Sequence, residues 1–245
     1  MKRRLSEVIE FPANPFVALT DFLVVLILIL ILAILHQTVS SSRLIERMAI
    51  SQLQQQLLTE ISTQASGSSK TAILNKAYHQ GQIKQTWVDG DLQRFRLQGK
   101  IFFDHGKATL SSAQAKQILT AFGEILRSHE GNLNDPGSGL YKRIIVEGHA
   151  DRSEGDNGQV WSLSLERASQ GTSVLQQAAG LSPLLIEASG RGCWDNNAIV
   201  THSMTPQQAS DVTADNRRLE IVIVFSGERS MEYLRQQGTK NRKGE

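Results

Sequence analysis

A long apolar run near the N-terminus constrains this chain more than any other feature. Residues 16–35 read FVALTDFLVVLILILILAIL, and only Thr20 and Asp21 interrupt the apolar pattern. A helix of about 20 such residues crosses the roughly 30 Å hydrocarbon core of a bilayer. We therefore predict a single transmembrane helix over residues 16–36, with membrane lipid around it.

Asp21 is the residue of this run that most needs an explanation. A carboxylate inside the membrane costs about 2.5 to 3.5 kcal/mol on insertion scales, so a chain that keeps one there has a use for it. The alternative is that so short a side chain reaches interfacial water, since Asp21 lies about 8 Å from the start of the run. We predict a role for Asp21 in ion translocation. Thr20 is the weaker candidate, because adjacent residues on a helix point in different directions.

The residues that flank the run predict its orientation. Lys2, Arg3 and Arg4 precede it, whereas HQTVSSS follows it. Cationic residues stay on the cytoplasmic side, so we expect a cytoplasmic lead over residues 1–15 and the bulk of the chain on the other side of the membrane. The apolar run is longer than the core of a signal peptide, and HQTVSSS is a poor cleavage site. These features predict an uncleaved anchor.

Composition argues against several other classes of protein. The formal net charge of +2 is small, and the sequence has no basic stripe interleaved with aromatic residues, so we expect no nucleic-acid partner. The six His residues are scattered, and Cys193 has no motif around it. We therefore expect no enzyme, no metal site and no cofactor.

Residues 37–93 are predicted to be a linker that contains an amphipathic helix. Its apolar residues recur mostly every four positions, as Leu44, Met48, Leu53, Leu57 and Ile61. So narrow a stripe favours pairing of two copies over burial in a core, which predicts a homodimer. Further along, QASGSSK at residues 64–70 is typical of a flexible spacer. A short helix over 72–79 and a turn at Trp87 and Gly90 are expected after it.

Residues 94–226 alternate between strand and helix patterns, in the order strand, helix, strand, helix, strand, strand. The strand patterns occupy residues 94–103, 142–147, 184–189 and 218–225, and the helical patterns occupy residues 110–126, with Ser111 or Ser112 as N-cap, and 164–179. This order predicts an α+β sandwich with helices on one face of a mixed sheet. Residues 193–211 are expected to form a polar loop, and residues 227–245 a basic, disordered tail.

Two charged residues flank the loop between the second predicted strand and the second predicted helix. Asp151 ends the segment Gly148-His149-Ala150-Asp151, and we expect Arg167 in the first turn of the helix, where unpaired N–H groups favour anions. A guanidinium binds a carboxylate with paired hydrogen bonds, and an aspartate accepts hydrogen bonds from an ammonium group. The spacing is equally consistent with a site that grips a zwitterion and with an Asp–Arg pair that only closes the loop.

Five ordered motifs resemble those of the OmpA C-terminal-like family of peptidoglycan-binding domains. They are F-x-x-G-x-A-x-L from Phe103, G-H-x-D from Gly148, L-S-x-x-R-A from Leu163, G-x-G from Gly190 and N-R-R-x-E from Asn216. The resemblance implies a βαβαββ sandwich that binds the stem peptide of peptidoglycan. It implies that Asp151 and Arg167 grip this peptide, with His149, Trp161, Leu163 and Ser164 in the same site.

The chain departs from the family pattern at three places. Ala150 and Val160 stand where the family usually has Thr and Asn, and the loop between Asp151 and Arg167 is about one residue longer than the common form. The missing Asn removes a candidate ligand or loop hydrogen bond.

The anchor is similar to that of MotB-type B subunits of flagellar stators, in which L-T-D-F-L at residues 19–23 would hold the ion-binding acid. The B component of Zorya anti-phage systems has the same plan. This resemblance implies a subunit of an ion-driven rotary motor in the bacterial inner membrane, with a periplasmic domain at residues 94–226, a multi-span MotA-like partner and translocated H⁺ or Na⁺. The alternative is a passive tether between membrane and peptidoglycan. Asp21 distinguishes the two, because a tether needs no charge in its anchor.

Overall fold

The structure is a computed structural model, and it describes residues 15–63, 69–131, 139–194 and 199–243. Most of the cytoplasmic lead and of the flexible spacer predicted from the sequence lies outside the described residues. The chain divides into two compact units, Met1–Ile45 and Glu46–Glu245, and each is described by itself.

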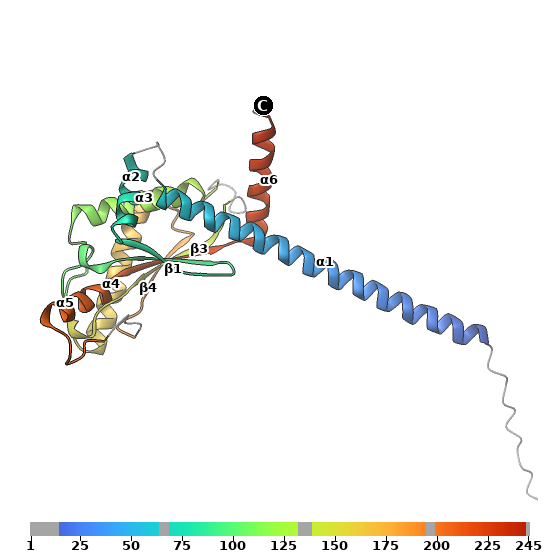
Figure 1. Cartoon of the computed structure of the whole chain (residues 1–245), viewed down its shortest axis with the longest axis horizontal. Coiled ribbons are helices and arrows are strands. Elements are labelled where there is room, and N and C mark those ends of the chain that lie inside the picture. Colours follow the sequence, from blue (N-terminus) through green and yellow to red (C-terminus); the bar gives the residue numbers. More distant parts are fainter. Residues whose placement is uncertain (1–14, 64–68, 132–138, 195–198, 244–245) are drawn as a thin grey trace, which may run out of the picture. The chain divides into compact units, whose positions relative to one another are not determined.

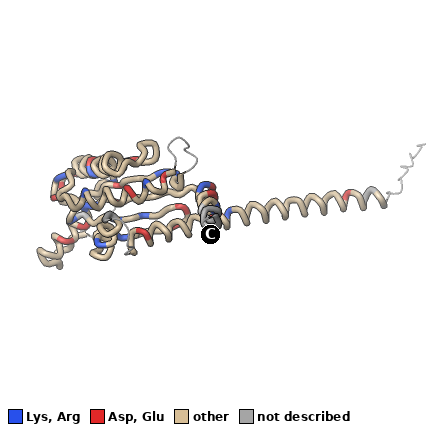
Figure 2. The backbone as a smooth tube through the Cα atoms, turned by 90° about the horizontal axis from the view of Figure 1, so that it is seen from above, with Lys and Arg blue, Asp and Glu red and all other residues tan. Residues whose placement is uncertain are grey.

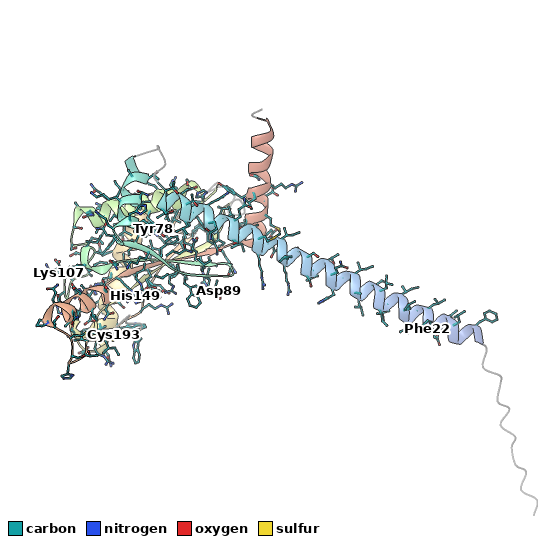
Figure 3. All side chains as sticks on the ribbon, in the orientation of Figure 1. Phe22, Tyr78, Asp89, Lys107, His149 and Cys193 are labelled. Carbon is teal, nitrogen blue, oxygen red and sulfur yellow. The ribbon has the colours of Figure 1, made fainter. Side chains whose placement is uncertain are left out.

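The first unit contains the N-terminal part of helix α1, Pro15–Ser62. Its apolar window has a mean hydropathy of 2.8, and none of that window is buried. Figure 2 shows how few charged positions this part of the chain carries, and Figure 3 labels Phe22 on its surface. By length and composition it is the one helix of the described residues that can span a membrane, which confirms the predicted apolar helix.

The second unit is built on a mixed five-stranded sheet of order β1-β2-β5-β3-β4 (Figure 1). The strands are β1 (Ile83–Asp89), β2 (Leu92–Leu97), β3 (Tyr141–Gly148), β4 (Ile186–Gly190) and β5 (Leu219–Phe225). β3 and β4 are parallel, and the other neighbours are antiparallel. The apolar run at Ile144 to Val146 lies in an inner strand, as predicted, because β3 pairs with β4 along one edge and with β5 along the other.

Helices α3 (Ala113–Ser128) and α4 (Asn157–Gln177) cover one face of this sheet, and α2 (Ser69–His79) packs against α3 and β1. The chain also forms α5 (Pro206–Asn216), which contacts the short 3₁₀ helix Gly99–Ile101, and α6 (Gly227–Lys243), which follows β5. α3 and α4 pack on each other through Gly123, whose missing side chain leaves room for Ala179 and Leu175. The core lies between these helices and the sheet residues Ile144, Val146, Leu219 and Ile221. Apart from β1 and α5, the elements follow the order β2-α3-β3-α4-β4-β5, which confirms the predicted βαβαββ sandwich.

The structure adds elements that the sequence pattern did not predict. The linker prediction covered β1, and Trp87 lies in that strand rather than in a turn. The predicted polar loop contains α5, whose start is fixed by a reciprocal capping box between Thr205 and Gln208 with Pro206 in the first turn. The predicted disordered tail contains α6.

Two element boundaries also differ from the prediction. The strand predicted over residues 94–103 corresponds to β2, which ends at Leu97. Gly99–Ile101 form a 3₁₀ helix instead, because glycine disfavours a strand. Leu110 pairs with Phe103 in an isolated bridge instead of entering α3, which starts after the N-cap Ser112.

The narrow apolar stripe after the membrane run is split between core and surface. Leu53, Leu57 and Ile61 are at most 3% exposed and belong to the domain core, whereas Leu44 and Met48 are 59% and 58% exposed. The interpretation that the stripe is left for pairing of two copies is therefore wrong for the three buried residues. A narrow stripe is wide enough for a helix that packs on one side of a domain.

Candidate functional site

The loop after β3 is organised by Asp151. Its Oδ1 accepts hydrogen bonds from the Ser153 backbone N–H at 2.8 Å and from Ser153 Oγ at 2.6 Å, and its Oδ2 accepts from Asn216 Nδ2 at 2.7 Å. Asp151 thereby caps a short 3₁₀ helix, Arg152–Glu154. It is 4% exposed, because α5 brings Asn216 against it.

Glu154 closes the same loop from the other end. Its Oε2 accepts from the Asp151 backbone N–H at 2.8 Å, which completes a capping box, and its Oε1 accepts from the Gly106 backbone N–H at 2.8 Å. Burial works to raise the pKa of this carboxyl, but hydrogen bonds from Arg167 outweigh it, and the pKa is lowered. Glu154 is therefore a buried, charged acid.

Arg167 uses all of its hydrogen-bond donors inside the protein. Nη1 donates to Glu154 Oε2 at 2.7 Å and Nη2 donates to Glu154 Oε1 at 2.6 Å, which is the bidentate geometry of a strong ion pair. The other three bonds run from Nε to the Lys107 carbonyl, from Nη1 to the His149 carbonyl and from Nη2 to the Asp104 carbonyl. A guanidinium has five N–H groups, so none remains for a ligand.

The direct pair between Asp151 and Arg167, one of the two interpretations that the spacing allowed, is therefore not what the structure shows. Arg167 pairs with Glu154, and both side chains are 0% exposed. Arg167 also does not lie in the first turn of its helix, because α4 begins at Asn157. Asp156 and Gln159 cap that helix start reciprocally, so the predicted anion contact there is already taken by the protein's own side chains.

A cleft of about 660 Å³ lies beside Asp151, at the end of the unit that holds α5. Figure 3 marks this region with Cys193, and Trp194, Ile199 and Val200 add an apolar wall. Among the described residues that line the cleft, only Asp151 and Arg152 carry charges. Arg152 is exposed. An apolar cleft with a few converging polar groups is the usual form of a ligand site.

Three of the predicted site residues lie on α4 and are not among the described residues that line the cleft. Ser164 is buried, accepts a hydrogen bond from the Gly192 backbone N–H at 2.8 Å and donates one to the Trp161 carbonyl at 2.7 Å. It thereby fastens the loop after β4 to the helix. Trp161 is 49% exposed, and Leu163 is half-buried.

His149 lies on the sheet face that the helices leave uncovered. Its ring nitrogens lack a hydrogen-bond partner among the described residues, and Glu147 and Glu220 lie close by. One candidate ligand atom from each of these three side chains lies within 4.8 Å of the other two, the spacing of a metal site. The two carboxylates, however, already bind arginines, namely Arg94, Arg96, Arg191 and Arg218. This excess of positive charge disfavours a cation and favours a structural network.

Acidification should destabilise the domain through His149. Burial, and after it the charge of Arg218, lowers its pKa to about 3 in the folded protein, whereas an unfolded histidine takes up a proton near pH 6.5. The unfolded state then binds more protons between these values, so stability falls as the pH falls. Between pH 7.5 and pH 5 we expect a loss of about 2 kcal/mol in the free energy of unfolding, measured by urea denaturation. His149→Gln should lack this part of the pH dependence; an unchanged slope would contradict the assignment.

Sequence reasoning missed Glu154, Arg152 and Asn216 as parts of the site. The spacing Asp151-x-x-Glu154 is a capping-box signature, and it falls in the part of the chain that is longer than the family form. That signal could have revealed Glu154. The contact between Asn216 and Asp151 joins residues 65 positions apart, and no local pattern predicts it.

Residues 102–211 match the model of the OmpA family. Among solved structures, a MotB-like protein from Desulfovibrio vulgaris is 18% identical, with a TM-score of 0.51 and 74% of this chain and 99% of that chain covered. The cell wall anchor of the type VI secretion system from Pseudomonas aeruginosa is 20% identical (TM-score 0.48; 63% and 96% covered). The periplasmic domain of Helicobacter pylori MotB is 17% identical (TM-score 0.44; 58% and 78% covered). No curated protein matches the sequence. At these identities, the likeness to the Desulfovibrio structure shows a shared fold.

Proposed function

Because residues 102–211 form an OmpA-family domain, we propose that this chain is the peptidoglycan-anchored subunit of an ion-driven membrane motor of the MotB type. The helix α1 anchors it in the bacterial inner membrane, and its folded unit holds the wall from the periplasm. One observation carries the motor part of the proposal. Asp21 puts a carboxylate on a helix whose neighbouring side chains are apolar and exposed, as expected of a span that faces lipid or a partner protein.

The proposed mechanism needs a partner and a second copy. Two copies would set their Asp21 residues inside a ring of a multi-span MotA-like protein. A cation, H⁺ or Na⁺, neutralises one carboxylate, and its release to the cytoplasm restores the charge. One elementary charge that crosses 100 mV releases about 2.3 kcal/mol, which is available to turn the ring around the stationary pair. The grip on peptidoglycan keeps the pair stationary.

Ion conduction tests the motor part of the proposal. The chain is co-expressed with a multi-span MotA-like protein, and cation flux into membrane vesicles is measured under an imposed potential. We expect flux that requires both proteins. Flux at the background level would reduce this chain to a passive tether, and a neighbouring set of nuclease or helicase genes would assign a working motor to anti-phage defence.

Binding to purified peptidoglycan sacculi tests the anchoring part. Asp151→Asn should weaken co-sedimentation of the full-length protein about tenfold or more, because the amide cannot supply the charge-assisted contact to an ammonium group of the stem peptide. The matched control is Glu166→Gln, an exposed carboxylate on α4 outside the cleft, which should bind like the wild type. Equal binding by all three proteins would place the wall-binding site elsewhere.

A further inference from the structure

Five charged side chains meet on the sheet face that α3 and α4 leave uncovered. Glu220 on β5 is the cross-strand partner of Arg96 on β2 and of Glu147 on β3. Arg94 lies two positions before Arg96, and alternate residues of a strand point to the same face of the sheet. Arg191 follows directly after β4. Four neighbouring strands therefore bring three arginines and two glutamates together, and we call these five residues the charged row.

Within the charged row, each glutamate is shared between arginines. Arg94 Nη1 donates to Glu147 Oε2 at 2.7 Å and to Glu220 Oε2 at 2.5 Å. Arg96 Nε donates to Glu220 Oε1 at 2.9 Å, and Arg191 Nε donates to Glu147 Oε1 at 2.9 Å. Guanidinium and carboxylate groups therefore alternate across the sheet, in the order Arg191, Glu147, Arg94, Glu220 and Arg96.

Solvent reaches the arginines of the charged row but not its acids. The side chains of Glu147 and Glu220 are 2% and 1% exposed, whereas those of Arg94, Arg96 and Arg191 are 25%, 26% and 47% exposed. A molecule that approaches this face of the sheet therefore meets guanidinium groups, and the carboxylates lie beneath them.

These arginines also keep N–H groups that the protein does not use. Within the described residues, Nε and Nη2 of Arg94, both terminal nitrogens of Arg96 and Nη1 of Arg191 have no hydrogen-bond partner. Guanidinium groups bind the oxygens of phosphates and carboxylates through paired hydrogen bonds. The charged row thus offers an anion several donors from three side chains.

The charges of this cluster do not cancel. Arg218 donates from Nε to Glu220 Oε1 at 2.7 Å, so four arginines stand against two glutamates, which leaves a net charge of +2. His149 does not change this balance at neutral pH, because burial, and after it the charge of Arg218, lowers its pKa to about 3. An anion with two negative charges would neutralise the cluster.

We propose that Arg94, Arg96 and Arg191 form a binding site for a phosphate monoester. Such a group carries a charge of about −1.5 to −2 at pH 7 and has three acceptor oxygens, whereas a carboxylate carries a single charge on two oxygens. The phosphate therefore matches both the net charge and the number of exposed guanidinium groups. None of the three arginines is among the described residues that line the cleft beside Asp151, so this site is separate from the proposed wall-binding site.

Calorimetric titration of the full-length protein in uncharged detergent micelles tests the site, with methyl phosphate and acetate as probes. The wild type should bind methyl phosphate about tenfold more tightly than acetate. Arg96→Gln and Arg191→Gln should each weaken methyl phosphate binding about tenfold. Both variants should fold, because Arg94 still pairs with Glu147 and Glu220. Arg191→Lys should keep part of the affinity, since it retains the charge but not the planar fork.

The matched control is Arg143→Gln. Arg143 is an exposed arginine on β3 that pairs with Glu187 outside the charged row, so this variant should bind methyl phosphate like the wild type. Wild-type affinity in both Arg96→Gln and Arg191→Gln, an equal loss in Arg143→Gln, or no binding of methyl phosphate by the wild type would overturn the inference. Sacculus binding should stay unchanged in every variant, so a failure of this site is distinct from a failure of the proposed function.

Lipid nanodiscs identify the source of the phosphate. The full-length protein is placed in discs of phosphatidylcholine, with or without phosphatidic acid, and is titrated with methyl phosphate. Loss of binding only in the discs that contain phosphatidic acid would assign the site to a lipid headgroup. Equal binding in both kinds of disc would assign it to a soluble phosphate ester, and binding in neither would overturn the inference.

Discussion

Replacing Arg167 with Ala should lower the free energy of unfolding by about 3 to 5 kcal/mol, because it removes one partner of a fully buried ion pair. The Glu154 carboxylate would remain in the protein interior with only two backbone N–H groups to stabilise it. Denaturation of the full-length protein in detergent, followed by the fluorescence of its tryptophans, measures the change.

The control is Arg143→Ala, which breaks the pair between Arg143 and Glu187, both about half exposed. Surface pairs of this kind contribute at most about 1 kcal/mol, so the control should stay close to the wild type. The double variant Arg167→Met with Glu154→Gln should recover part of the loss, because it leaves no unpaired charge. A loss below about 1 kcal/mol in Arg167→Ala would contradict the buried pair.

The pH dependence of the free energy of unfolding is a second test of the ion pair between Arg167 and Glu154. In the wild type the lowered pKa of Glu154 stabilises the fold above the unfolded pKa of about 4.3, and that contribution is lost as the pH falls further. In Arg167→Ala, burial would raise the pKa of Glu154 instead, and protonation would remove the unfavourable charge. The difference in stability between wild type and variant should therefore narrow between pH 7 and pH 4. A difference that stays constant with pH would mean that lost packing, not the charge, causes the destabilisation.

The elements that the sequence predicts best are those whose local pattern and burial agree. The apolar run at Ile144 to Val146 and the β-branched run at Leu219 to Phe225 are inner strands, and both are found where predicted. β1 was not predicted, because it is an edge strand that buries few residues: Lys84, Trp87 and Asp89 are all exposed. The polar composition of α5 did not indicate a helix. Its start could still have been recognised, because Thr205 and Gln208 have the spacing of a capping box and Pro206 follows the N-cap.

The site was harder to predict than the fold. The sequence placed Asp151 and Arg167 near the same loop, and the structure confirms that proximity through Glu154, which contacts both. It could not show which acid Arg167 pairs with, because Arg167 is also held by the backbone carbonyls of Lys107 and Asp104, which are 60 and 63 positions away in the sequence. Such contacts arise from tertiary packing and leave no periodic trace.

Replacing Asp21 with Asn should reduce cation flux through the co-expressed complex to the background level and abolish rotation. The amide has nearly the shape of the acid, but it cannot take up and release a proton or neutralise a sodium ion. Each elementary charge that crosses 100 mV releases about 2.3 kcal/mol, but without a carboxylate to bind the cation this energy cannot be coupled to rotation of the ring. Flux into vesicles under an imposed potential measures the loss, and sacculus binding should be unchanged because Asp21 lies outside the folded unit.

Two neighbouring substitutions show whether the charge itself is responsible. Asp21→Glu keeps an ionisable acid that is longer by one methylene, so it should retain part of the flux. Thr20→Val removes a hydroxyl next to Asp21 and should leave most of it, because adjacent residues of a helix do not share a face. Normal flux in Asp21→Asn would refute ion coupling through this residue. The chain would then be a wall tether whose anchor contains an acid at the edge of the lipid.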